Sequence, residues 1–278
     1  MVAPFELRDG GAMPRLGMGT WHMGERAGSS ASEAAALRLG LDLGMTLIDT
    51  AEMYGEGGAE SVVGEAIRGR RDEVFVVSKF YPHHASRMKL VAACDASLRQ
   101  LGIDTLDLYL LHWRGRVPLD ETVDTLEGLV RDGKIRRWGV SNFDVGDMEE
   151  LLAVRHGDRV AANQVLYNLA RRGVEFDLAP WCAARGIALM AYSPLDEGRL
   201  VRHPALDSVA KRVGASAGQV AIAWLLRHRG VVTIPKAATA AHISANRAAA
   251  GLVLDAAALE SLERAFPAPR RKQPLGML

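Results

Sequence analysis

The sequence has few cysteines, no long apolar run and almost no net charge. Its 278 residues include only Cys94 and Cys182, which excludes a disulfide scaffold and predicts buried, reduced thiols. The longest apolar run, 220–226, is too short to span a bilayer, and no signal-peptide pattern opens the chain. A formal net charge of +1 gives no footprint for nucleic acid. We therefore expect a cytoplasmic monomer without a membrane or nucleic-acid partner.

A Gly-rich dinucleotide fingerprint is also missing. Gly17-Met18-Gly19 is the nearest candidate, but it lacks the third glycine and no helix follows it at once. The Gly-rich segment 54–58 follows the second predicted strand instead of the first. Both segments are expected to form tight turns, which argues against an open doubly wound sheet.

Short apolar runs alternate with amphipathic stretches along the whole chain. The predicted strands are 16–20, 46–49, 74–79, 106–111, 135–140, 160–165, 187–191 and 231–234. The predicted helices are 32–43, 59–68, 87–101, 119–131, 145–155, 176–185, 206–213, 217–227, 240–250 and 256–265, the first of them capped by Ser32. Asp9-Gly10 between two short extended runs indicates an N-terminal hairpin. The pattern predicts an α/β fold, a (β/α)8 TIM barrel with an N-terminal β-hairpin and extra C-terminal helices, as one domain over residues 1–278.

Polar residues follow the apolar runs at the points where the strands end. Asp49, Lys79 and His112 end three successive runs, and Tyr54 follows shortly after the first of these. In a closed barrel of parallel strands all these ends lie on one face, where active sites are built. We therefore expect the four side chains to meet.

The four residue types suit the reduction of a carbonyl group. Buried charges are costly unless paired, and neighbouring strands lie about 5 Å apart, so Asp49 and Lys79 are expected to form an ion pair. An ammonium group beside the phenol of Tyr54 should lower its pKa and make it a general acid. His112 could donate a hydrogen bond to the same substrate oxygen. Hydride would have to come from a cofactor.

The chain resembles the aldo-keto reductases, in particular short bacterial members that reduce small aldehydes and ketoaldehydes, including methylglyoxal reductases. The motifs that carry the resemblance are Asp49-Thr50-Ala51-Glu52-Met53-Tyr54-Gly55, Lys79, Leu111-His112-Trp113, Gly139-Val140-Ser141-Asn142-Phe143 and Ile234-Pro235-Lys236. The resemblance runs in order over nearly the whole chain. It implies a nicotinamide cofactor bound without a Rossmann fold, and a catalytic tetrad of Asp49, Tyr54, Lys79 and His112 with Tyr54 as proton donor.

The resemblance also implies a set of cofactor-binding residues. Ser141, Asn142 and Gln164 would hold the carboxamide, and Tyr192 would stack on the nicotinamide ring. The other implied contacts are Thr20 and Trp21, Ser193 and Leu195 along the pyrophosphate, and Lys236, Thr239, His242 and Asn246 at the adenosine end. The family usually has serine and arginine where this chain has Ala237 and His242. We still expect NADPH as the favoured cofactor, with NADH possible because histidine grips a 2′-phosphate less firmly than arginine.

The substrate pocket is expected to have an apolar wall. Its predicted residues are Trp21, Met53, Phe80, Tyr81 and Trp113, which lie at or near strand ends. The short connection from His112 to Leu119 and the short C-terminal tail suggest an open pocket for a small carbonyl substrate.

Two other functions compete with this interpretation. A metal-dependent barrel hydrolase would need a cluster of ligands, but His83 and His84 lack an obvious third ligand, so no metal is expected. A non-catalytic regulatory barrel could bind the cofactor and turn over slowly. The complete tetrad argues against that alternative.

Overall fold

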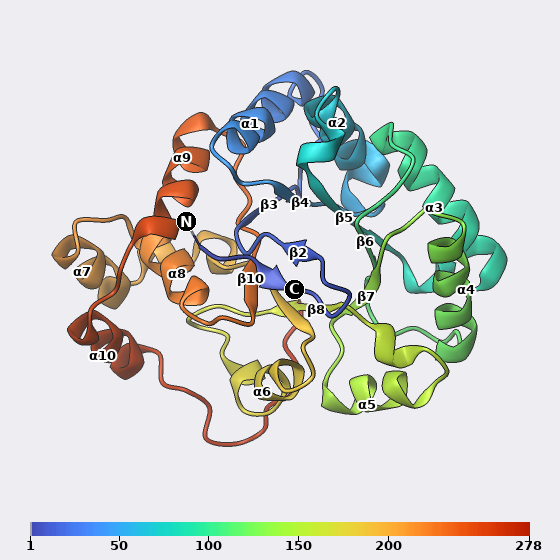
Figure 1. Ribbon diagram of the computed structural model, residues 1–278. Coiled ribbons are helices and arrows are strands. Elements are labelled where there is room, and N and C mark those ends of the chain that lie inside the picture. Colours follow the sequence, from blue (N-terminus) through green and yellow to red (C-terminus); the bar gives the residue numbers. More distant parts are fainter. Residues whose placement is uncertain (1) are drawn as a thin grey trace.

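The computed structural model describes residues 2–278, and eight parallel strands form its centre (Figure 1). They are β3 (Gly17–Gly19), β4 (Leu47–Asp49), β5 (Phe75–Phe80), β6 (Leu108–Leu111), β7 (Trp138–Ser141), β8 (Ala162–Leu166), β9 (Ala188–Tyr192) and β10 (Val231–Thr233). Each strand pairs with the next in chain order. Parallel bridges from Leu16 to Thr233 and from Gly19 to Lys236 join the first strand to the last. The predicted barrel is confirmed.

Helices surround the strands, as Figure 1 shows. They are α1 (Ser30–Asp42), α2 (Gly58–Ile67), α3 (Arg87–Leu101), α4 (Leu119–Arg131), α5 (Val145–Ala153), α6 (Leu178–Ala183), α7 (Pro204–Arg212), α8 (Ala217–Leu226), α9 (Ala240–Ala248) and α10 (Ala256–Ala265). The expected cap at Ser32 is wrong, because α1 already begins after Ser29 and the Ser32 hydroxyl donates to the Ser29 carbonyl. Within residues 2–278, no helix has both the length and the apolar character needed to cross a bilayer.

The N-terminal hairpin closes one end of the barrel. Strands β1 (Phe5–Glu6) and β2 (Ala12–Met13) pair antiparallel, as predicted. Leu7 and Met13 pack with inward residues of the barrel strands in one buried apolar cluster. This plug fills the end where the strands begin. The polar strand ends lie at the opposite end of the barrel.

Alternation along β5 decides which of its side chains can reach the site. Val77 belongs to the interior cluster, and Lys79, two residues later, points the same way. Phe80 is fully buried on the other side, packed 5.0 Å from the Tyr109 ring in the layer between strands and helices. The prediction of Phe80 as a pocket residue is therefore wrong.

Candidate active site

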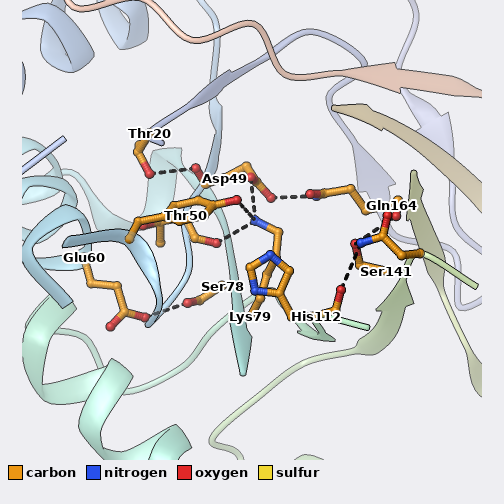
Figure 2. A network of polar contacts seen from close by, with 11 residues as sticks. Thr20, Asp49, Thr50, Glu60, Ser78, Lys79, His112, Ser141 and Gln164 are labelled. Atoms are coloured by element: carbon orange, nitrogen blue, oxygen red, sulfur yellow. Dashed lines mark hydrogen bonds and ion pairs between the residues drawn. The ribbon is translucent and has the colours of Figure 1, made fainter. Parts of the chain in front are cut away.

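Asp49 and Lys79 form the expected buried ion pair. Strands β4 and β5 are neighbours, with Asp49 opposite Val77. Lys79 Nζ lies 2.7 Å from Asp49 Oδ2 and 2.8 Å from the Thr50 carbonyl oxygen (Figure 2). It also lies 3.3 Å from Tyr54 Oη. The three ammonium hydrogens thus have three acceptors. Burial opposes the charge, but Asp49 and Tyr54 outweigh it and raise the pKa of Lys79, which keeps the ammonium charged.

The pKa of Tyr54 differs from the expectation. Burial raises it above the ordinary value and Asp49 adds to the rise, whereas Lys79 lowers it as predicted but does not prevail. The prediction of a lowered pKa is therefore wrong, because it counted the cation and left out desolvation. Tyr54 consequently keeps its proton at neutral pH, as a proton donor must.

His112 stands beside the phenol as a neutral ring. Its ring centroid is 5.9 Å from that of Tyr54 in an edge-on arrangement. Burial and the nearby Lys79 lower the pKa of His112 to about 3. A neutral imidazole can donate a hydrogen bond from one ring nitrogen, but it lacks the extra proton that an imidazolium could give up. Within residues 2–278 no cluster of three or more His, Cys, Asp or Glu side chains could hold a metal ion.

Polar side chains from β7, β8 and β9 meet on the other side of the site. Ser141 Oγ donates to the main-chain carbonyl oxygen of Gln164 at 2.8 Å, and Tyr192 Oη donates to Asn142 Oδ1 at 3.0 Å. Asn142 has a left-handed backbone (φ 60°), and its amide donates to the His112 carbonyl. The four residues expected around the nicotinamide are thus brought together. Gln164 additionally donates to Asp49, which the sequence did not indicate.

The remaining predicted cofactor residues lie along one side of the barrel mouth. Thr20 is buried, and its hydroxyl donates to the Asp49 carbonyl. Ser193 has φ 49° in the turn that follows β9, and Leu195 lies in the same turn. The adenosine-end residues surround the start of α9, where Lys236, Thr239 and His242 are exposed and Asn246 is buried.

Aromatic rings from two loops form a wall beside the tetrad. Trp113 lies 5.0 Å from His112 and 5.9 Å from Tyr81, measured between ring centroids. Trp21 is 40% exposed, and Met53 is half-buried directly before Tyr54. These four of the five predicted pocket residues lie near the strand ends that carry the tetrad.

Sequence reasoning missed the residue that holds this wall. Glu52 Oε1 accepts from the Tyr81 backbone N–H at 2.6 Å and lies 2.9 Å from His84 Nδ1. A signal was present, because Glu52 stands between Asp49 and Tyr54 in one motif. Its partner loop could not be identified without coordinates.

Comparison with known proteins now decides the family. The family model described as "Aldo/keto reductase family" matches residues 15–266. The chain belongs to the aldo/keto reductases. Methylglyoxal reductase YeaE of Escherichia coli is 51% identical over 272 residues, 96% of each chain. Glyoxal reductase of Bacillus subtilis is 37% identical over 234 residues, 83% of this chain and 81% of the relative.

Solved structures of the family share the whole fold. An aldo/keto reductase from Klebsiella pneumoniae, crystallised with NADP and acetate, matches this aldo/keto reductase with a TM-score of 0.97. Its sequence is 49% identical, and each chain is covered to 100%. The resemblance stated from the motifs is confirmed.

Proposed function

We propose that this aldo/keto reductase uses NADPH to reduce small aldehydes and ketoaldehydes such as methylglyoxal to alcohols. The observation that carries the proposal is the contact of Lys79 Nζ with both Asp49 and Tyr54, next to a neutral His112. The similarity to a methylglyoxal reductase and to a structure holding NADP supports the substrate class and the cofactor.

The residues present fit a nicotinamide cofactor. Amide and hydroxyl groups of Ser141, Asn142 and Gln164 match the donors and acceptors of a carboxamide, and the Tyr192 ring offers a flat apolar face. When bound there, the cofactor supplies hydride.

The chain's own residues supply the proton and orient the carbonyl. Tyr54 donates its Oη proton to the substrate oxygen as negative charge develops there. Lys79 stabilises the phenolate that remains, and Asp49 holds Lys79 in place. Neutral His112 donates a hydrogen bond to the same oxygen and fixes its direction. The aromatic wall of Tyr81 and Trp113 excludes water from one side.

His242 is proposed to weaken discrimination between NADPH and NADH. It is exposed in the first turn of α9, where the family usually has an arginine. An imidazole, which lacks the planar fork of donors, holds a 2′-phosphate less firmly than a bidentate guanidinium. Comparable catalytic efficiencies with both cofactors are expected, and a preference above about a thousandfold would contradict this idea.

Turnover tests the proposed function directly. Purified protein is mixed with NADPH and, separately, methylglyoxal, glyoxal and an aromatic aldehyde, and the loss of NADPH absorbance is recorded. The proposal expects consumption that depends on the carbonyl substrate. Tight NADPH binding without consumption would favour the non-catalytic regulatory barrel instead. Action as a monomer in the cytoplasm completes the proposal, and size-exclusion chromatography tests the first part.

A further inference from the structure

The side chain of Gln164 reaches across the interior of the barrel. Gln164 lies in β8 and Asp49 ends β4, with three strands between them in each direction around the barrel. The Gln164 amide nitrogen Nε2 donates to Asp49 Oδ1 at 2.8 Å (Figure 2). Both residues are only 2% exposed. One hydrogen bond thus joins opposite walls of the barrel at the site.

The chemistry of the two groups fixes which atoms meet. An ionised carboxylate only accepts hydrogen bonds, so the amide must present its N–H. Asp49 Oδ1 is taken by Gln164, and Oδ2 lies 2.7 Å from Lys79 Nζ. Each carboxylate oxygen therefore has its own partner from a different wall. A bare oxygen in this buried position would be costly.

The backbone of Gln164 is held independently of its side chain. Its carbonyl oxygen accepts from Ser141 Oγ and from the Asn142 backbone N–H, both at 2.8 Å. A substitution of the side chain leaves these two hydrogen bonds available. It removes the bond across the barrel and, when the cofactor is bound, the expected contact of the amide with the carboxamide.

We propose that Gln164 is a positioning residue for the proton donor, a role that rests on the proposed function. It holds Asp49 so that Oδ2 alone pairs with Lys79, which keeps the ammonium within reach of Tyr54. The contact from Lys79 Nζ to Tyr54 Oη, at 3.3 Å, is the longest of the three that the ammonium makes. Without the amide, Asp49 can turn both oxygens toward Lys79 and draw it away from the phenol. A residue that served the carboxamide alone would not affect this contact.

The substitution Gln164→Met removes the amide but keeps an unbranched side chain of similar length. We expect kcat at saturating NADPH to fall about tenfold or more. The Kd for NADPH, from tryptophan fluorescence, should rise no more than in Ser141→Ala, because each variant loses one expected contact with the carboxamide. The solvent deuterium isotope effect on kcat should rise, because proton transfer becomes slower. Ser141→Ala is the matched control, since Ser141 belongs to the same expected carboxamide group without touching Asp49. It should weaken NADPH binding and leave the solvent isotope effect unchanged.

A double-mutant cycle with Asp49→Asn tests whether Gln164 affects kcat through Asp49. If Gln164 acts through Asp49, Gln164→Met lowers kcat far less in the Asp49→Asn background. The same cycle on urea unfolding without cofactor should show coupling between the two residues. Independent costs in both cycles would overturn the proposal, as would a kcat at saturating NADPH close to that of the wild type. A wild-type protein without turnover would overturn the proposed function, whereas the unfolding cycle would still report on the contact.

Discussion

At the scale of single residues, Lys79 connects the charges of the site. It is fully buried and contacts a carboxylate, a carbonyl and a phenol. Any one of these three contacts could be explained by ordinary packing, but the three hydrogens of a buried ammonium group need all three acceptors. This shared dependence makes Asp49, Lys79 and Tyr54 one unit, in which removal of one member leaves another group buried without its partner.

Removal of the buried ammonium should destabilise the fold. Lys79→Met leaves the Asp49 carboxylate uncompensated, and we expect the free energy of unfolding in urea to fall by about 3–5 kcal/mol. Adding Asp49→Asn should restore much of the loss. Lys211→Met is the control, because Lys211 pairs with Asp207 on the exposed surface and screening makes such a pair weak. Equal effects at the two lysines would contradict the importance of burial.

At the scale of elements, a tight turn sets the place of Tyr54, the proposed proton donor. Residues 55–57, directly after Tyr54, all have positive φ, including Glu56 at 51°. The turn leads from the end of β4 into α2, which packs on α3. The Gly-rich sequence correctly predicted a tight turn here. The turn expected at Gly17-Met18-Gly19 is wrong, because these residues form strand β3 of the barrel. The position of α2 therefore bears on the position of Tyr54.

The close approach of α2 to α3 can be tested at Gly64. A Cβ there would lie 2.5 Å from the Leu101 carbonyl oxygen at the end of α3. Gly64→Ala should lower the free energy of unfolding by about 1–3 kcal/mol, because one helix must shift. Gly128→Ala in α4 is the control, since its nearest neighbour is the flexible end of Arg131 at 3.8 Å. It should be neutral or stabilising by up to about 1 kcal/mol, through helix propensity. Chemical denaturation of both variants measures the difference.

At the scale of the whole molecule, buried His112 and half-buried His228 make stability depend on pH. Burial and nearby cations lower the pKa of His112 to about 3 and that of His228 to about 4. The unfolded chain binds protons near pH 6.5 that the folded chain cannot bind. The stability that the two neutral histidines contribute to the fold is therefore fully present above about pH 6.5. It is lost as the pH falls toward 4 and then 3.

Urea unfolding at a series of pH values measures this dependence. Each histidine should contribute a slope of up to about 1.4 kcal/mol per pH unit between its two pKa values. The double variant His112→Gln/His228→Gln should show a shallower decline than the wild type. His242→Gln, at an exposed position, should follow the wild-type curve. Identical slopes in all three proteins would rule out the two histidines as the source of the pH dependence.

The sequence predicted much of this molecule, and the failures have physical causes. Strand ends marked the site because parallel strands place them on one face, and α3 and α4 were bounded correctly. Phe80 was misplaced because the parity of a strand cannot be assigned when both of its faces are buried. The pKa of Tyr54 was misjudged because desolvation depends on packing from other elements. The Gln164–Asp49 bond joins opposite walls, and only the closed barrel brings them together.

Tyr54→Phe tests the central claim most directly. The variant keeps the ring but lacks the hydroxyl, so the fold and the Kd for NADPH should change by less than about threefold. Its kcat with methylglyoxal should fall by at least about a hundredfold, because the variant has lost the hydroxyl that donates the proton. A kcat close to that of the wild type would contradict the assignment of Tyr54 as proton donor, and with it the mechanism proposed for this reductase.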